Sequence, residues 1–214
     1  MDRMRSMPEE QAPIARGSYA KGIARRQEIL DRAIEVFARR GSGKTSLRAI
    51  AEEVGVTHAA LKHYFGSLEE LLVAVYRESE RRGDPDDSTG PDATPVELLR
   101  QWTESNREVP GLVQLYSTLV AAALEEGHGA ARDFATERFA RVRADLADRV
   151  RRNQAAGRLR ADVEPEAVAA LVIAASDGLQ TQWLLDPAAP QDAALSLLDA
   201  LLSHPETPPR AQPA

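Results

Sequence analysis

The sequence of 214 residues contains no cysteine. A disulfide, a zinc site with thiolate ligands and a cysteine nucleophile are therefore excluded. We also find no apolar run of the length that crosses a bilayer, and residues 1–17 mix charged residues with two prolines where a secretory signal has an apolar stretch. These absences predict a cytoplasmic protein with no membrane segment. No residue pattern requires a metal or another cofactor.

Charge is distributed unevenly along the chain. The formal net charge is −6, which by itself argues against a nucleic-acid partner. Residues 1–66, however, contain 12 lysines and arginines against 8 acidic residues, whereas the remaining residues contain 15 against 25. A basic N-terminal part on an acidic remainder is typical of proteins that bind DNA at one end. Chance variation is the alternative explanation, so this observation needs support from a motif.

The chain between its two ends is expected to be helical. Ala, Leu, Arg and Glu dominate it, apolar residues recur at helical spacing, and no segment alternates with a period of two. We therefore predict an all-α protein of about nine helices with essentially no sheet. Prolines 95, 165 and 190 fit helix starts, and proline 110 marks a break. The expected helices cover residues 21–40, 47–54, 58–64, 67–82, 94–108, 111–126, 130–156, 165–185 and 191–202.

Composition also suggests the domain boundaries. Residues 1–18 and 204–214 are predicted to be disordered tails, and residues 83–92, rich in turn formers and acids, an acidic loop. Between the tails we predict a DNA-binding domain over residues 19–66 and a helical domain over residues 67–203. Ser67 followed by Glu70 is expected to form a capping box that opens the first helix of that second domain.

A compact motif occupies residues 47–65. Gly55 supplies the left-handed turn conformation that branched residues resist. Val56 then closes the turn against the core, Thr57 is suited to cap a second short helix, and Leu61 anchors that helix. The pattern is that of a helix-turn-helix. The buried stripe of its first helix is formed by Leu47, Ile50, Ala51 and Val54.

The second helix of this motif presents short or cationic groups that can approach base edges and phosphates. For the charged residues, a solvated surface is the alternative; for the hydroxyl residues, helix capping is the minimum role. A metal pair formed by His58 and His63 is not expected, because a spacing of five residues splays the two rings apart. The predicted DNA contacts are Lys21, Lys44, Thr45, Ser46, Arg48, Thr57, His58, Ala60, Lys62, His63 and Tyr64.

Residues 21–72 resemble the N-terminal domain of TetR-family regulators. The resemblance rests on an ordered series across some 25 positions. Two departures affect the expected phosphate contacts: Lys62 stands where the family often has a phosphate-contacting tyrosine, and Leu68 where it often has a lysine. Lys62 can approach phosphate as a point charge, whereas Leu68 cannot, so that interaction is absent or made elsewhere. The matching residues are Ile50-Ala51, Val54-Gly55-Val56-Thr57, Tyr64-Phe65 and Ser67-Leu68-Glu69-Glu70-Leu71.

The resemblance implies a dimer whose last two long helices pair with those of a second subunit. The sequence supports this, because residues 165–185 are nearly all apolar and such a helix must be buried on every side. Pairing with residues 191–202 of both subunits covers the part that one subunit leaves open. The predicted interface residues are Leu171, Ala174, Leu195, Leu198 and Leu202.

The resemblance also implies a small-molecule pocket in the second domain. Asp177 and Gln180 lie on one helical face within an apolar segment, where a buried carboxylate needs a partner. That partner is either a ligand or a group across the dimer, and the sequence leaves both possibilities open. For each aromatic residue, plain core packing is the alternative. The predicted ligand contacts are Trp102, Asn106, Tyr116, Phe134, Phe139, Asp177, Gln180 and Trp183.

The expected function is therefore a ligand-responsive repressor that binds a palindromic operator as a dimer and is released by a small-molecule effector. The alternative is a helix-turn-helix activator, or a DNA-binding protein without ligand response. Residues 38–45 satisfy a loose Walker A pattern, but an amphipathic helix precedes them where a phosphate loop needs a buried strand. With no recognisable nucleophile–base pair either, an enzyme is not expected.

Overall fold

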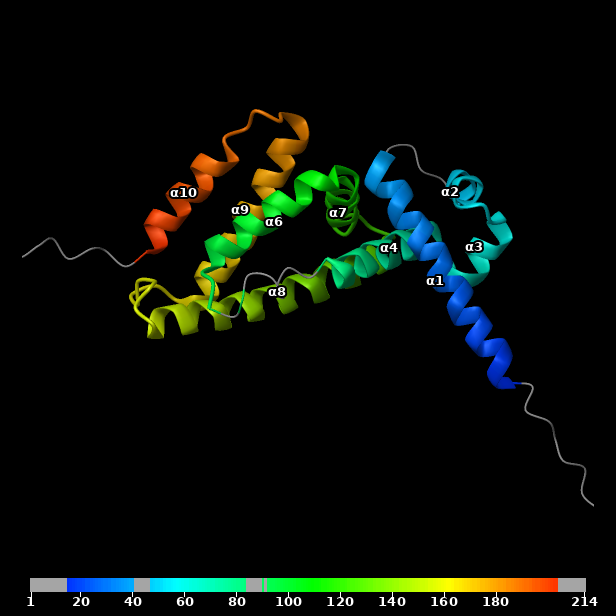
Figure 1. The fold of residues 1–214 in the computed structure, drawn as a ribbon, viewed down its shortest axis with the longest axis horizontal. Coiled ribbons are helices and arrows are strands. Elements are labelled where there is room, and N and C mark those ends of the chain that lie inside the picture. The colour runs from blue at the N-terminus through cyan, green and yellow to red at the C-terminus, as the bar shows by residue number, and fades with distance from the viewer. Residues whose placement is uncertain (1–14, 41–46, 84–89, 91, 204–214) are drawn as a thin grey trace, which may run out of the picture.

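The computed structural model describes residues 15–40, 47–83, 90 and 92–203. Within these residues it contains nine α-helices and no strand; one isolated bridge joins Leu159 to Ser203 (Figure 1). The all-α prediction is confirmed. The helices are α1 (Ala15–Arg40), α2 (Leu47–Val54), α3 (His58–Phe65), α4 (Leu68–Arg82), α6 (Pro95–Glu108), α7 (Pro110–Ala122), α8 (Gly129–Ala155), α9 (Pro165–Leu185) and α10 (Gln191–Leu202).

Two predicted boundaries were wrong. Helix α1 begins at Ala15, so residues 15–18 are helical and do not belong to a disordered tail. The last proline before this helix is Pro13, and residues 15–40 contain none that would interrupt it. Helix α7 ends at Ala122, four residues before the expected end. The chain tightens there, since the Leu124 and Glu125 N–H groups each bond to the carbonyl three residues back. The tails 1–14 and 204–214, and most of the acidic loop, lie outside the described residues.

The helix-turn-helix has the local chemistry that its sequence predicts. Gly55 has a φ of +74°, and the Val56 N–H donates to the Ala51 carbonyl at 2.8 Å, closing the turn. The Thr57 hydroxyl accepts from the Ala60 N–H at 3.1 Å and so caps α3. Arg32 of α1 donates to the Val54 carbonyl at 2.9 Å, satisfying the C-terminal end of α2. These bonds fix how α2 and α3 cross.

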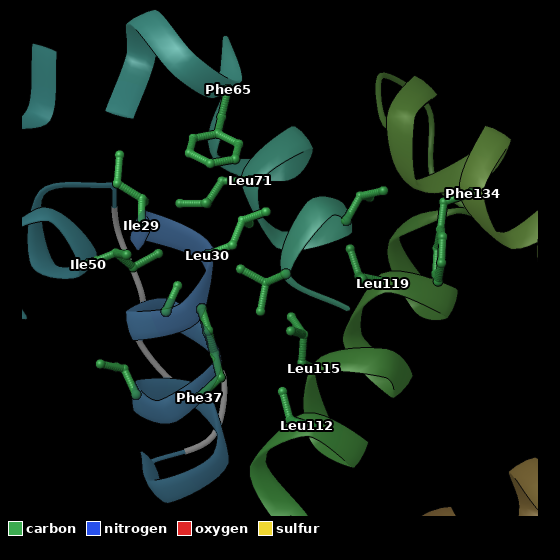
Figure 2. Packing of buried hydrophobic residues seen from close by; sticks show 14 of the residues in the cluster. Ile29, Leu30, Phe37, Ile50, Phe65, Leu71, Leu112, Leu115, Leu119 and Phe134 are labelled. Atoms are coloured by element: carbon green, nitrogen blue, oxygen red, sulfur yellow. The ribbon is translucent and has the colours of Figure 1, made fainter. Parts of the chain in front are cut away.

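Two hydrophobic clusters hold the molecule together. The first joins α1, α2 and α3 to α4, α7 and the start of α8, and includes Ile29, Phe37, Phe65 and Leu115 (Figure 2). It continues across the domain boundary predicted at residue 66, so the N-terminal three helices share their core with the second domain. The other cluster lies among α6, the later part of α8, α9 and α10. The long helix α8 contributes to both and connects the two ends of the molecule (Figure 1).

Helix α9 corrects the statement that the sequence contains no apolar run of the length that crosses a bilayer. Its 21 residues have a mean hydropathy of 1.2 over the best window, which by length and composition alone is enough to cross a membrane. This is weak evidence, because core helices of other proteins pass the same test. One face of α9, with Val168, Ala169, Val172 and Ser176, is buried, and the helix packs mainly on α8.

Candidate nucleic-acid interface and interior polar site

Helix α3 packs through one face and leaves the other open. Leu61 and Phe65 are buried in the first hydrophobic cluster, with Leu61 0% exposed. The residues expected to contact DNA lie on the other side: Thr57, His58, Lys62 and His63 are exposed, and Ala60 and Tyr64 are half-buried. A short helix anchored by two large apolar side chains, with a cationic outer face, has the form of a recognition helix.

The other predicted DNA contacts are less closely grouped. Arg48 is exposed on α2, where its Nε lies 3.4 Å from a Glu52 carboxylate oxygen; such an exposed pair is weak and leaves the guanidinium available to phosphate. Lys21 is exposed on α1. Lys44, Thr45 and Ser46 lie outside the described residues, as does most of the Walker-like segment, which α1 precedes and α2 follows.

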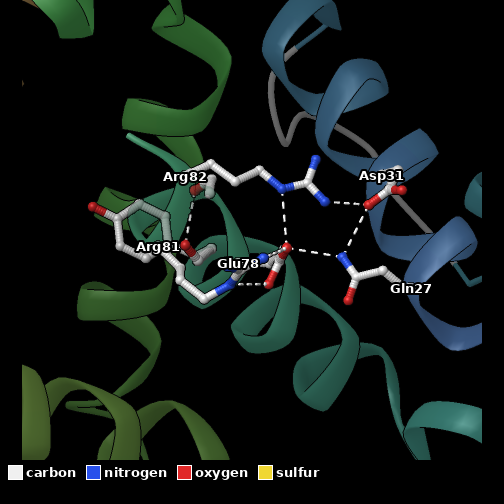
Figure 3. A network of polar contacts seen from close by, with 7 residues as sticks. Gln27, Asp31, Glu78, Arg81 and Arg82 are labelled. Carbon is white, nitrogen blue, oxygen red and sulfur yellow. Dashed lines mark hydrogen bonds and ion pairs between the residues drawn. The ribbon is translucent and has the colours of Figure 1, made fainter. Parts of the chain in front are cut away.

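A polar network attaches α1 to the last turn of α4 (Figure 3). The Gln27 side chain donates to Asp31 at 3.0 Å and to Glu78 at 2.8 Å. Arg82 donates to the same Glu78 oxygen at 2.9 Å and also bonds to Asp31. Arg81 donates to the other Glu78 oxygen at 3.0 Å. Glu78 is therefore the centre of the contact between the DNA-binding end and α4.

Acid is expected to weaken this network. The Arg81 hydrogen bond, followed by those of Arg82 and Gln27, holds the pKa of Glu78 at about 2, below its ordinary 4.5. A lowered folded-state pKa adds stability that is fully present above about 4.5 and lost as pH falls toward 2. We therefore expect Glu78→Gln to reduce stability at pH 6 and to flatten its loss below pH 4.5, in urea titrations at each pH. Glu126→Gln, at an exposed carboxylate, should reproduce the unmodified profile; an unchanged profile in Glu78→Gln would contradict this assignment.

Helix α4 is fastened along the first half of α8. At its start, Glu69 accepts from the Ala131 N–H at 2.8 Å and lies 2.6 Å from His128 Nδ1. Glu69, a residue of α4, therefore caps the N-terminus of α8. Midway, the Arg77 and Glu137 side chains lie 2.5 Å apart. At its end, Glu80 accepts from Arg138 and Arg141. These contacts join α4 to α8, and Glu78 joins α4 to α1.

An interior polar site joins four helices. The Tyr116 hydroxyl of α7 donates to Asp177 Oδ2 of α9 at 3.1 Å, and Arg138 of α8 donates to that hydroxyl at 3.1 Å. Arg138 Nε also donates to Glu80 of α4 at 2.8 Å. Burial raises the pKa of Tyr116 well above its ordinary value, so its hydroxyl keeps its proton and serves both bonds. Tyr76 stacks on Tyr116 with ring centroids 5.2 Å apart.

The structure brings together only some of the predicted ligand residues. Tyr116 and Asp177 meet directly, and Phe134 adjoins them through Tyr76, with ring centroids 5.6 Å apart. Phe139 lines a separate open cleft of about 360 Å³ between α7 and α8. The remaining four lie elsewhere: Trp102 packs on the second cluster, Gln180 donates to Ser176 at 2.9 Å, and Asn106 and Trp183 are half-buried.

Sequence reasoning missed the centre of this site. Arg138 was not among the predicted residues, and neither were Tyr76 and Glu80. Helix α8 contains many arginines, and no local pattern distinguishes those that turn inward, Arg138 and Arg149, from the exposed ones. Within the protomer, the Tyr116 hydroxyl is a hydrogen-bond partner of Asp177 that the sequence analysis did not consider.

Asp177 is predicted to reduce stability at neutral pH. Burial raises the pKa of this carboxyl, a change that Arg138 and the Tyr116 hydroxyl only partly offset. A raised folded-state pKa means that stability falls as pH rises through it. Asp177→Asn, which keeps an acceptor for Tyr116, should therefore raise the thermal unfolding midpoint at pH 7, by an amount that shrinks toward pH 4. Asp145→Asn, at an exposed carboxylate, is the control. A lowered midpoint in Asp177→Asn would contradict the prediction.

The predicted dimer residues also need correction. Leu195, Leu198 and Leu202 are buried in the protomer's own second cluster, at 1%, 8% and 5% exposure. Side chains so covered have almost no area left to bury against a partner, because they fill the space between α10 and its neighbours. Leu171 and Ala174 of α9 are exposed as expected. On α10 the exposed leucines are Leu197 and Leu201.

Together, the exposed α3, its two-helix motif and the helical body define a helix-turn-helix DNA-binding protein. Comparison with known proteins identifies its family. Residues 29–75 match the model described as "Bacterial regulatory proteins, tetR family", and residues 96–204, half of the chain, match "BetI-type transcriptional repressor, C-terminal". The chain belongs to the TetR family of bacterial transcriptional regulators. The family and its relatives are regulators rather than enzymes.

Individual relatives agree with this assignment. The chain is 29% identical over 157 residues to the HTH-type transcriptional repressor Rv1474c of Mycobacterium tuberculosis, covering 73% of this chain and 80% of that protein. Among solved structures, the multidrug binding protein EbrR, complexed with imidazole, aligns at 28% identity with a TM-score of 0.59, covering 86% and 93% of the two chains. A TetR-family transcriptional regulator from Rhodococcus aligns at 24% identity and TM-score 0.66, covering 83% and 96%, and shows the shared fold.

Proposed function

We propose that this regulator is a cytoplasmic repressor that binds a palindromic operator as a dimer and leaves it when a small molecule binds the body. The observation that carries the proposal is the exposed outer face of α3, held on a core that continues into the body. Similarity to a curated repressor supports repression. Similarity to a structure described as a multidrug binding protein supports a small-molecule response.

The dimer is proposed to form through the exposed stripe of α9 and α10. Leu171, Ala174 and Gly178 recur along one side of α9, with Leu197 and Leu201 on α10, and all five are exposed in the single protomer. Four helices joined through such faces form a common dimer core. Leu171→Arg should give a monomer at micromolar concentration in analytical ultracentrifugation, while Arg143→Ala, on an exposed position of α8, stays dimeric. A dimeric Leu171→Arg protein would move the interface elsewhere.

The ligand is proposed to act on the interior polar site. Asp177, Tyr116, Arg138 and Glu80 come from four different helices, so a molecule that rearranges them also rearranges those helices. A ligand that binds better to the second arrangement shifts the population toward it. Through α4 and Glu78, the shift changes the spacing of the two α3 helices.

Selection from a pool of random duplex DNA tests the proposal. The purified protein should enrich an inverted repeat whose half-sites lie about one helical turn, roughly 10 base pairs, or a multiple apart. A reporter gene downstream of that repeat should be expressed less when the protein is present. Enrichment of no sequence would overturn the DNA-binding proposal, and higher reporter expression would favour the activator alternative.

A further inference from the structure

Arg138 occupies an aromatic site inside the body. Its guanidinium carbon lies 4.4 Å from the centroid of the Tyr116 ring and 5.9 Å from that of Tyr76. The two tyrosines stack with an interplanar angle of 25°. We refer to Tyr76, Tyr116, Glu80 and Asp177 as the tyrosine box. Aromatic faces attract cations through the ring quadrupole, and more strongly where water is excluded.

The tyrosine box carries more negative than positive charge around its centre. Glu80 accepts from Arg138 Nε at 2.8 Å, and Asp177 is reached by the Tyr116 hydroxyl at 3.1 Å. Arg138 is the more buried of the two cations beside these groups, with its side chain 17% exposed. Arg141, which also pairs with Glu80, is 59% exposed and is largely solvated. The box thus presents two carboxylates and two ring faces to one buried guanidinium.

We propose that the tyrosine box is a binding site for the positively charged group of a compact organic cation, such as a guanidinium or an alkylammonium, which takes the place of Arg138. The inference rests on the proposed function and specifies the charge class of its ligand. The groups that hold Arg138 recognise its charge and planar shape, and these are available to any small cation of that shape. The charge and shape of the Arg138 guanidinium therefore indicate which class of molecule the tyrosine box can bind.

The exchange of Arg138 for a ligand is proposed to take place through the side chain of Arg138. An arginine side chain is long and flexible, and this one already reaches partly into solvent, so its guanidinium can rotate outward and regain hydration. The incoming cation then neutralises Asp177 in its place. Because Arg138 is tethered beside the box, its effective concentration there is about millimolar, and a free cation must compete with it.

The exchange also loosens the attachment of α8 to α4. Glu80 gives up its bond from Arg138 and keeps only the longer one from Arg141, at 3.2 Å. Glu80 stands two residues from Glu78, which holds α1 (Figure 3). The tyrosine box is thus connected to the DNA-binding end through a single turn of α4.

Removing the internal competitor tests the proposal. Arg138→Ala should bind ethylguanidinium at least tenfold more tightly than the unmodified protein does, as measured by calorimetry without DNA. Ethylurea, which has the same shape without the charge, and propanoate, an anion, should each bind at least tenfold more weakly. Adding Asp177→Asn to Arg138→Ala should weaken the ethylguanidinium complex by tenfold or more. Arg143→Ala, lacking an exposed cation of the same helix, should bind ethylguanidinium as the unmodified protein does.

Equal binding of ethylurea, or no gain in Arg138→Ala, would overturn the proposal. If Arg138→Ala does not fold, magnetisation transfer from tyrosine ring protons to ethylguanidinium in the unmodified protein replaces it, and absence of transfer at millimolar cation overturns the proposal. Since these measurements contain no DNA, their failure concerns only the tyrosine box. Failure to select an operator concerns the proposed function.

Discussion

Double replacement of Lys62 and Arg48 by alanine is expected to weaken operator binding about thirtyfold near 0.15 M salt. Both side chains are exposed, Lys62 on α3 and Arg48 on α2. Each phosphate that a protein cation neutralises contributes about 0.9 to the slope of log affinity against log salt. Without these two cations the slope falls by roughly 1.8. If the two proteins bind equally at about 1 M salt, where the electrostatic contribution vanishes, this difference in slope amounts to about thirtyfold near 0.15 M. Fluorescence anisotropy with labelled operator at several salt concentrations measures both quantities.

The control for this prediction is Arg143→Ala. Arg143 is an exposed arginine on α8 in the body, so its replacement changes the net charge without altering the surface near α3. We expect its affinity and salt slope to stay close to those of the unmodified protein. If the double variant retained both the affinity and the slope, Lys62 and Arg48 would not bind phosphate.

Leu61→Ala is expected to lower the free energy of unfolding by about 2–5 kcal/mol. Leu61 is 0% exposed and packs α3 into the cluster that α1, α4 and α7 share. Removing it leaves a cavity that the surrounding helices fill only in part. Because the core is continuous, the reduced stability should appear in α4 and α7 as well as α3. Urea titration followed by circular dichroism, with hydrogen exchange to locate the change, measures it.

His58→Ala, on the exposed side of the same helix, provides the comparison. Its effect on stability should stay within about 0.5 kcal/mol, as for most surface substitutions. If the effect of Leu61→Ala were equally small, or if hydrogen exchange changed in α3 alone, the shared core would be contradicted.

The helix-turn-helix could be predicted because its determinants are local. Gly55 adopts the positive φ that its position requires, and Thr57 caps the next helix within three residues. The predicted capping box at Ser67 and Glu70 is found only in part. The structure shows the Ser67 hydroxyl accepting from the Glu70 N–H, but the complete capping box forms at Thr94 and Glu97, where both reciprocal bonds are present.

The interior site could be predicted only in part because its contacts are distant in sequence. Arg138 and Glu80 are 58 residues apart, and Tyr116 and Asp177 are 61 apart. A buried carboxylate on an apolar helix indicated that Asp177 had a partner, but not that the partner was Tyr116. The face of α10 that points away from the protomer was predicted wrongly for a similar reason. Leucines occur on several of its faces, and only packing against α6 and the second cluster decides that Leu195 is covered and Leu197 is exposed.

Oxidative footprinting of the protein on its selected operator tests the central claim most directly. His58 and His63 are exposed on α3 and react readily with hydroxyl radicals in the free protein, as does His128 of the body, which is half-buried. If α3 enters the major groove, operator DNA should protect His58 and His63 and leave the oxidation of His128 unchanged. Unaltered oxidation of both α3 histidines in the DNA complex would contradict the account.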